Sequence, residues 1–438
     1  MRWNVPIVVI MALSTTAPAR AQATQEPDET ARPFRGVFGA PQAPASERLI
    51  FGLTLGAGYD DNVFADDSSL SSGFDPLRPR RSTTGFLTAN LSYSRGLAGG
   101  NLTAAINSAT RYYDALRDPL VSRQMASVAG SWKLTSRTSA TASQNVRFEP
   151  YYSLWAAESP TQPDAGPGAF DADPGTQTRV ANRLRLGTNV ALSQQLSRRS
   201  SVSIDYGRQH SQTGQADFGL ELQHTGVSVR HAVGRGVAVR LGYRYLMGRF
   251  DADDESDRFA NHSADFGLDF GRGFSLRRGT TLGVGTGVVA IRQADSTRYR
   301  LTGHVRLAQE LGRTWSASIA YARYVRYVDS FRQPVLADSL GATVGGLVNR
   351  RLGLAGGVGV SEGDIGTRLS SNRFRLYYGN AGVTVGIRRN VGLGVSYSYN
   401  RYRFGSDIDL PRGVPRRVGR QAVTVSLQLT PLISWTGR

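Results

Sequence analysis

A short turn that carries an arginine recurs along the chain at a nearly constant spacing. The arginines that mark these turns are Arg95, Arg137, Arg198, Arg235, Arg272, Arg313, Arg350 and Arg388. Subtracting successive residue numbers gives intervals of 42, 61, 37, 37, 41, 37 and 38 residues. Each interval holds a segment of alternating apolar and polar residues, a longer polar loop and a second alternating segment. This pattern predicts an up-and-down β-barrel with tight turns at one rim and long loops at the other.

The N-terminal residues have the pattern of a secretory signal peptide. Arg2 supplies a positive charge, the stretch from Val5 to Leu13 is apolar but too short to cross a bilayer, and Ala21-Gln22-Ala23 fits a cleavage site. We therefore expect removal of residues 1–23, with an uncleaved anchor helix as the alternative. Residues 24–47, rich in proline, alanine and glutamate, are expected to form a periplasmic leader, and residues 48–438 the barrel.

The composition excludes several classes of protein. Cysteine is absent, which excludes a disulfide framework and a cysteine-based metal site. No apolar run after the signal segment is long enough for a transmembrane helix, but a barrel strand needs apolar side chains only at every second position. The net charge of +18 comes almost wholly from arginine. These arginines are spread over turns and alternate strand positions, so we expect no nucleic-acid partner.

Alternation can be followed segment by segment between residues 49 and 430. In the segment 237–250, Val237, Val239 and Leu241 share one face, and Arg240 and Arg244 share the other. The sequence thus predicts an all-β fold, a transmembrane antiparallel up-and-down β-barrel of about 18 strands. Sixteen strands is the alternative, because the fourteenth and fifteenth segments are rich in glycine. An even count brings both ends of the barrel to the periplasmic rim.

Aromatic residues favour the membrane barrel over a soluble β-sandwich or propeller, which would also alternate. Trp132 and Trp315 flank short turns. The aromatic residues near the long loops are Tyr112, Tyr113, Phe148, Tyr151, Tyr152, Tyr245, Phe250, Tyr327, Tyr402 and Phe404. Two aromatic bands are typical of the two interfaces of a membrane. We expect a protein of a Gram-negative-type outer membrane, in contact with its lipid and lipopolysaccharide and inserted by the barrel-assembly machinery.

Eight arginines alternate with apolar neighbours and are predicted to line the pore. They are Arg183, Arg185, Arg240, Arg244, Arg300, Arg306, Arg373 and Arg375. An arginine facing the middle of the bilayer would cost about 2–4 kcal/mol, so these side chains are expected to point into the lumen. There they would favour anions, including carboxylate-bearing polysaccharides. The alternative is a plugged lumen, in which they pair with Asp205, Asp265, Asp269 and Glu310.

The one long interval between arginine turns contains the largest loop, residues 150–179. It is rich in proline and carries the acidic residues Glu158, Asp164, Asp171 and Asp173. It is the third outer loop, and in general porins the third loop folds into the lumen and narrows it. We expect this loop to form a constriction or lid, with a flexible surface loop as the alternative.

The first outer loop begins with Gly58-Tyr59-Asp60-Asp61-Asn62-Val63-Phe64. Together with the barrel pattern, this motif resembles the opening of the outer-membrane barrels called the β-barrel porin 2 family, some of which accompany exopolysaccharide systems. The resemblance implies a porin or an export pore. The two aspartates could bind a divalent cation, but a turn that ends the strand is the favoured interpretation.

No sequence pattern indicates catalysis. His210-Ser211 and His262-Ser263 each place a histidine and a serine on opposite faces of a strand, so neither dipeptide forms a nucleophile–base pair. His210 and His224 could meet across neighbouring strands. The serine-hydrolase and zinc-protease motifs G-x-S-x-G and H-E-x-x-H are absent. We expect a non-enzymatic channel without a cofactor for hydrophilic, anionic solutes; the alternatives are an exopolysaccharide export pore and a structural or adhesive barrel.

Overall fold

The computed structural model describes residues 47–63, 81–115, 119–151, 180–213, 218–234, 236–252, 255–270, 279–293, 296–328, 333–366, 373–406, 408 and 416–437. The expected signal peptide, the leader up to residue 46 and the four acidic residues of the expected constriction loop lie outside these residues. No helix in the described part of the chain is long and apolar enough to cross a membrane.

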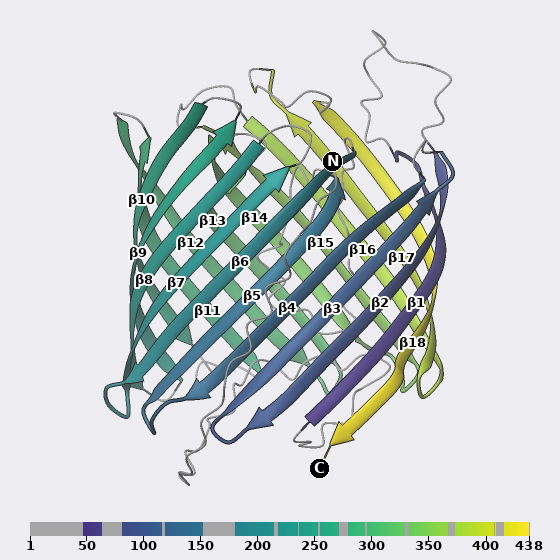
Figure 1. Ribbon diagram of the computed structural model, residues 1–438, viewed down its shortest axis with the longest axis horizontal. Coiled ribbons are helices and arrows are strands. Elements are labelled where there is room, and N and C mark those ends of the chain that lie inside the picture. Colours follow the sequence, from purple (N-terminus) through teal and green to yellow (C-terminus); the bar gives the residue numbers. More distant parts are fainter. Residues whose placement is uncertain are drawn as a thin grey trace, which may run out of the picture.

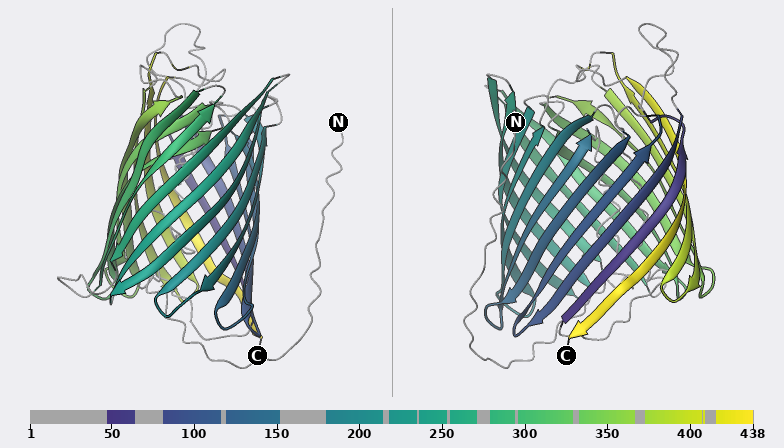
Figure 2. Two further views of the ribbon diagram at one scale, coloured as in Figure 1. Left: turned by 90° about the vertical axis from the view of Figure 1, so that its left-hand side faces the viewer. Right: turned by 45° about the vertical axis from the view of Figure 1, so that its right-hand side comes forward.

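Eighteen antiparallel strands form one sheet that closes on itself (Figures 1 and 2). They are β1 (Glu47–Asp60), β2 (Ser82–Leu97), β3 (Gly100–Tyr113), β4 (Leu120–Lys133), β5 (Thr138–Tyr151), β6 (Val180–Gln195), β7 (Ser200–Thr213), β8 (Phe218–Gly234), β9 (Val237–Ala252), β10 (Glu255–Phe270), β11 (Thr280–Gln293), β12 (Ser296–Leu311), β13 (Trp315–Val328), β14 (Gln333–Leu347), β15 (Leu352–Ile365), β16 (Arg373–Arg388), β17 (Val391–Phe404) and β18 (Arg417–Gly437). Each strand pairs with its neighbours in the chain, and β1 pairs with β18. The predicted barrel and its strand count are confirmed.

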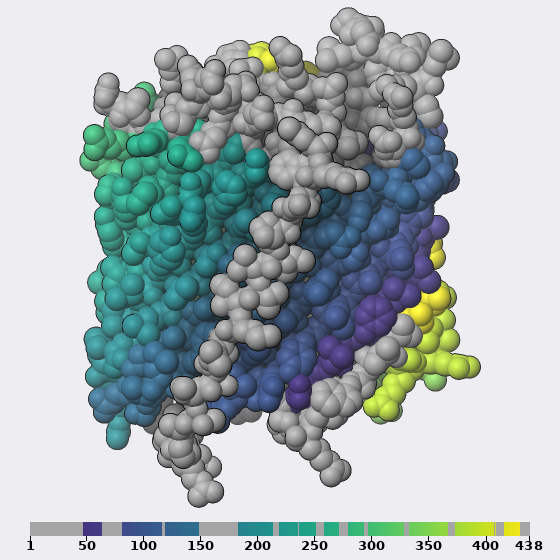
Figure 3. Space-filling view, viewed as in Figure 1, coloured from purple at the N-terminus to yellow at the C-terminus, as the bar shows by residue number. Residues whose placement is uncertain are grey.

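The register divides every strand into an outward and an inward set of side chains. Leu55 on β1 pairs with Leu87 on β2. Leu91, which shares a face of β2 with Leu87, pairs with Ile106 on β3. The exposed large apolar side chains of the strand interiors belong to this one set around the whole barrel. The other set contains most of the glycines and small polar residues, as a concave wall requires. The first set therefore faces outward and forms an apolar band. Figure 3 shows one side of this outer surface.

Three of the arginine-bearing turns share a local structure. In each of them a hydroxyl or amide oxygen accepts hydrogen bonds from the backbone N–H groups two and three residues later. Thr135 Oγ1 accepts from Arg137 and Thr138, Ser197 Oγ from Arg199 and Ser200, and Asn349 Oδ1 from Arg351 and Leu352, at 2.8–3.1 Å. Such side-chain contacts replace the ladder bonds lost at a tight turn.

A second turn type uses glycine. Gly236 and Gly312 have φ values of 82° and 75°, in the left-handed region that other residues rarely adopt. In both cases an arginine of the repeat, Arg235 or Arg313, is the adjacent residue. The regular spacing of these arginines therefore follows from the regular spacing of the turns beside which they lie.

Strand β18 extends beyond residue 430, the predicted end of the alternating pattern, and includes Pro431. It continues to Gly437 and pairs with the beginning of β1, with a shift in register between Phe51 and Leu53. Proline lacks an amide hydrogen and is tolerated in a strand where pairing is interrupted. The proline therefore interrupts the ladder without ending the strand.

Candidate functional site

Six of the eight predicted pore-lining arginines lie on the inward face. Arg183 and Arg185 of β6, Arg240 and Arg244 of β9, and Arg300 and Arg306 of β12 all belong to the inward set of the register. Arg183 is buried, and its Nε donates a hydrogen bond of 3.0 Å to Ser211 Oγ. The others are at least partly accessible from the lumen.

The prediction for Arg373 and Arg375 is wrong, because both lie on the outward face. They share that face of β16 with the exposed residues Tyr377, Val383 and Val385. The intervening Phe374 and Leu376 point inward and are buried in an apolar cluster. The alternation predicts apolar side chains on the outward face, but at the outer end of β16 the apolar side chains point inward and the arginines outward. Above the apolar band the outward face reaches the polar headgroup region, where charge is favourable.

Charged side chains on β7 to β10 form a network on the lumen wall. Asp205 lies 3.3 Å from His224 Nε2 and 3.8 Å from Arg244 Nη2. Lower on the wall, Arg240 Nε is 3.7 Å from Asp265 Oδ2, and Arg230 Nε is 3.8 Å from Asp269 Oδ2. The contacts of the arginines are long and their side chains are at least one-third exposed, so they remain available to a solute.

Glycines on the inward face make room for these large side chains. Gly207 pairs directly with His224, Gly226 with Asp205, and Gly242 with Asp265. A Cβ atom at any of these glycines would lie within 2.1–2.5 Å of the partner's side chain. The charged groups therefore lie flat along the wall over a glycine.

Strand β12 adds arginines with no acidic partner. Arg298 and Arg306 point inward, and in the described part of the chain neither guanidinium has an ion pair or hydrogen bond. His304 lies between them in sequence and packs over Gly285. Of the ion pairs expected in a plugged lumen, those of Asp205, Asp265 and Asp269 are present on the wall of β7 to β10, whereas Arg298 and Arg306 have no partner among the described residues.

Basic charge is concentrated on one side of the lumen. The basic side chains described on the inward face of β3 to β13 are Arg111, Arg123, Lys133, Arg147, Arg183, Arg185, Arg230, Arg240, Arg244, Arg298, Arg300, Arg306 and Arg326, and the acidic ones are Asp205, Asp265, Asp269 and Glu310. The described inward residues of β14 to β17 and β2 carry no charge. Between these two groups of strands, β1 and β18 carry Arg48 and the paired Asp60 and Arg420 on the inward face. The lumen therefore has a basic wall on β3 to β13, opposite the uncharged inner face of β14 to β17.

A hollow of about 550 Å³ lies along the basic wall. Its lining combines short polar residues of β3 to β6, including Asn101, Thr103, Ser131 and Asn189, with small apolar residues such as Ala129 and Ala191. The Asp205–His224–Arg244 group also lines it. The polar side chains of this lining can exchange hydrogen bonds with water or with a hydrated solute.

The outer half of the lumen is narrowed by the end of β13. Strands β12 and β13 pair from Leu311–Trp315 to Gly303–Arg323 and not beyond. Above this point Tyr327 stacks on Phe259 of β10, with ring centroids 4.0 Å apart, and donates a 2.5 Å hydrogen bond to Asn261 Oδ1. Phe250 of β9 also contacts this ring. These partners face inward and lie several strands away, so the end of β13 must lean into the lumen.

Two apolar clusters flank the inward-leaning end of β13. Leu220, Phe250, Phe259 and Tyr327 form the first, on the side of β8 to β10. The second lies on the inner face of β14 to β18, includes Val335, Leu376 and Tyr402, and contacts Tyr324 of β13. The end of β13 is therefore packed between two walls. The sequence predicts a constriction of the lumen by residues 150–179. In the described part of the chain, the lumen is narrowed instead by the end of β13.

Half of the predicted outer aromatic band lies inside the barrel. Tyr112, Phe148 and Tyr245 belong to the outward set. The inward aromatic residues of that band are Tyr113, Phe250, Tyr327, Tyr402 and Phe404, each at most 8% exposed. The sequence predicts that these residues lie near strand ends, but it does not predict that they face the lumen. Packing against other side chains inside the lumen determines that orientation.

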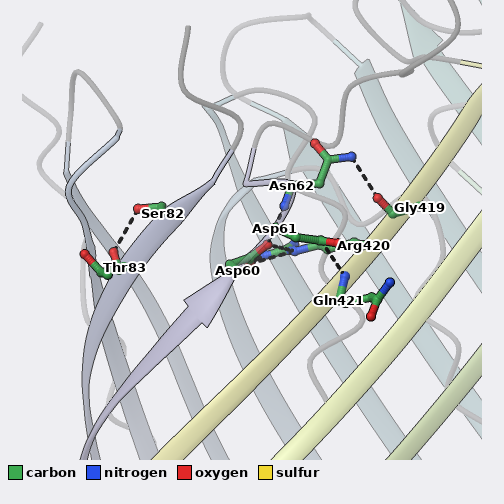
Figure 4. A network of polar contacts seen from close by, with 8 residues as sticks. All are labelled: Asp60, Asp61, Asn62, Ser82, Thr83, Gly419, Arg420 and Gln421. Atoms are coloured by element: carbon green, nitrogen blue, oxygen red, sulfur yellow. Dashed lines mark hydrogen bonds and ion pairs between the residues drawn. The ribbon is translucent and has the colours of Figure 1, made fainter.

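The GYDDNVF motif ties the first strand to the last (Figure 4). The Asp60 carboxylate accepts hydrogen bonds from Arg420 of β18, including Nε contacts of 3.1 and 2.9 Å. Asn62 Nδ2 donates to Gly419 O at 2.8 Å, and Asp61 Oδ1 accepts from the Gln421 amide at 2.7 Å. The favoured turn interpretation omitted this cross-seam role. In the described residues no group of three metal-ligating side chains is found.

The histidine pair considered for catalysis is not assembled. His210 faces outward and is paired with Glu221, whereas His224 faces the lumen and is paired with Gly207. His231 also faces outward, near the periplasmic rim, where its Nδ1 lies 2.8 Å from Ser200 Oγ.

A closed wall of membrane-spanning strands with an apolar band around it defines an outer-membrane β-barrel. Neither a protein-family profile nor a curated protein sequence matches the chain. Among solved structures, the siderophore receptor PirA from Pseudomonas aeruginosa is similar, with 12% identity, a TM-score of 0.42, and coverage of 89% of this chain and 81% of that one. OccAB4 from Acinetobacter baumannii has 10% identity and a TM-score of 0.43, with 90% and 100% covered.

Proposed function

We propose that the protein is a porin-like channel for hydrophilic solutes, with a preference for anions. The observation that carries this proposal is the excess of basic over acidic side chains on one wall of the lumen. Fixed charge of one sign along a low-dielectric wall raises the local concentration of the opposite ion. Arg298 and Arg306 contribute most directly, because no carboxylate neutralises them among the described residues.

The hollow on the basic wall supports passage of hydrated solutes. Its serine, threonine and asparagine side chains can replace water around a hydroxylated or carboxylate-bearing solute. Arg244, which lines the hollow, would bind a carboxylate through two hydrogen bonds. Uronate-bearing polysaccharides fit the same chemistry, which makes an exported polymer the alternative cargo.

A closed structural barrel is the second candidate. The inward end of β13, packed between two apolar clusters, favours it. In this case no steady conductance would be measured.

Planar-bilayer recording under a salt gradient tests both candidates. A channel gives steady conductance, and its reversal potential indicates anion preference. The double variant R298Q/R306Q should lose part of that preference, whereas R401Q/R403Q removes the same charge from the outward face and should leave it unchanged. An unmoved reversal potential in R298Q/R306Q would refute charge selection, and absence of conductance in the wild type would refute the channel.

A further inference from the structure

The outward face of β16 to β18 carries a compact arginine cluster at its outer end. Its members are Arg373, Arg375, Arg401, Arg403 and Arg417, which we call the outer arginine cluster. The register places Arg375 directly opposite Arg403, and Arg403 directly opposite Arg417. Neighbouring strands are about 4.8 Å apart, so these three side chains arise within roughly 10 Å of one another.

The cluster has an excess of positive charge. Arg375 pairs with Glu362 at 2.8 Å, and Arg373 lies 3.9 Å from Asp364. Arg401, Arg403 and Arg417 are exposed and have no ion pair within the described part of the chain. Five arginines and two carboxylates leave a net charge of +3 (5 − 2) on this patch. Three adjacent guanidinium groups that have no counter-charge among the described residues can accept an anionic ligand.

The position of the cluster relative to the apolar band identifies its environment. Along the outward face of β17 the order from mid-barrel to the outer end is Leu393, Val395, Tyr397, Tyr399, then Arg401 and Arg403. Aliphatic residues face the hydrocarbon layer and tyrosines the interface. Arginines directly beyond the tyrosines reach the headgroup layer of the outer leaflet.

We infer that the outer arginine cluster binds the phosphate groups of lipopolysaccharide. The outer leaflet presents this lipid with anionic phosphates on its sugar headgroup and acyl chains below. Guanidinium groups bind phosphate through paired, charge-assisted hydrogen bonds. The acyl chains would lie along Val395, Val423 and Val425, which are exposed on the band beneath the cluster. One surface therefore provides contacts for both parts of the lipid.

The inference is tested with the full-length folded protein in detergent and defined lipids. Native mass spectrometry would count bound lipid, and a titration would give Kd for diphosphoryl lipid A, monophosphoryl lipid A and phosphatidylethanolamine. We expect binding in that order of strength. The variant R401Q/R403Q/R417Q should weaken diphosphoryl lipid A binding about tenfold or more, since charge-assisted hydrogen bonds are lost.

A matched control removes the same charge from the lumen. The variant R240Q/R298Q/R306Q should bind lipid A within about twofold of the wild type, since these residues face inward. The variant R401K/R403K/R417K keeps the charge but loses the planar fork and should bind with intermediate strength. Unchanged binding by the outer glutamine variant, equal losses in both glutamine variants, or no preference for phosphorylated lipid would each overturn the inference.

Discussion

The contact between Asp60 and Arg420 closes the barrel where its first and last strands meet, and its loss should be costly. The two side chains are 4% and 8% exposed, and the Arg420 guanidinium bonds both carboxylate oxygens. In the variant Arg420→Met, Asp60 keeps its charge but loses its partner in a site almost without water. Breaking a buried ion pair in this way costs about 3–5 kcal/mol. At roughly 1.4 kcal/mol per factor of ten, the unfolding equilibrium should change by two to nearly four orders of magnitude.

The double variant D60L/R420M separates the pair's net contribution from the penalty for leaving a buried charge. With both charges replaced by apolar groups, the stability should return close to that of the wild type, because desolvation offsets much of the attraction in a buried pair. The exposed pair Arg375–Glu362, whose side chains are 52% and 54% exposed, is the control. Arg375→Met should cost at most about 1 kcal/mol.

Equilibrium unfolding in urea with the protein in lipid bilayers gives these free energies. Tryptophan fluorescence and the faster gel migration of a folded barrel provide two independent readouts. A loss of less than about 1 kcal/mol in the free energy of unfolding for Arg420→Met would refute this prediction. It would show that water reaches the Asp60 carboxylate or that the outer ends of β1 and β18 are not held together in solution.

Three further predictions concern other parts of the molecule. Tyr327→Ala removes the ring that stacks on Phe259 and should destabilise the barrel by about 3–5 kcal/mol while raising single-channel conductance; unchanged conductance would exclude β13 as a constriction. Gly248→Ala would place a Cβ 2.1 Å from the Phe259 ring and should lower the free energy of unfolding in urea by about 1–3 kcal/mol. Gly283→Ala, whose added Cβ would have no atom within 4 Å, should be nearly neutral. Equal losses in the two variants would refute the packing argument. Hydrogen bonds from Ser82 and Thr83 hold the pKa of Asp114 below its ordinary value of 3.8, so its stabilisation is fully present above pH 3.8 and lost as pH falls through the folded pKa. The stability difference between the wild type and Asp114→Asn should therefore shrink on acidification, and a constant difference from pH 7 to 3 would contradict this linkage.

The barrel architecture could be predicted because its causes are local. A strand such as β9 shows apolar side chains at every second residue, and turn residues such as Thr135 and Asn349 form their hydrogen bonds within a few positions. Repetition of such signals gives the number of strands and the rim to which each turn belongs.

Near the ends of strands, the direction in which a side chain points depends less on the local sequence. In β16 the pattern Arg-Phe-Arg-Leu alternates whichever side faces the lumen. The orientation is decided by burial of Phe374 and Leu376 against Tyr402 of the next strand, together with solvation of the arginines outside. Such packing between strands is not visible in one segment, and the eight proposed pore arginines therefore divide into six inward and two outward.

The narrowing at β13 had no signal in its own segment. Tyr327 follows the alternation of its strand and has an outward position by count, yet it contacts β9 and β10 inside the lumen. Its place depends on the parting of β12 and β13, a property of two strands and of the aromatic residues across the lumen. The GYDDNVF motif is a related case, since Arg420 is 360 residues away from Asp60.

The parting of β12 and β13 also determines where the cylinder is mechanically weakest. In a closed sheet the expected weak line is the seam where the two chain ends meet, since no turn joins those strands. Here that seam carries the Asp60–Arg420 contact at its outer end, whereas the covalently joined β12 and β13 have no ladder pairs above Gly303 and Arg323. Tyr299 and Leu301 of β12 border this interval and are 71% and 67% exposed. A force that pulls the wall apart would therefore split it sideways beside β12, facing the outer leaflet, while the junction of the chain ends held.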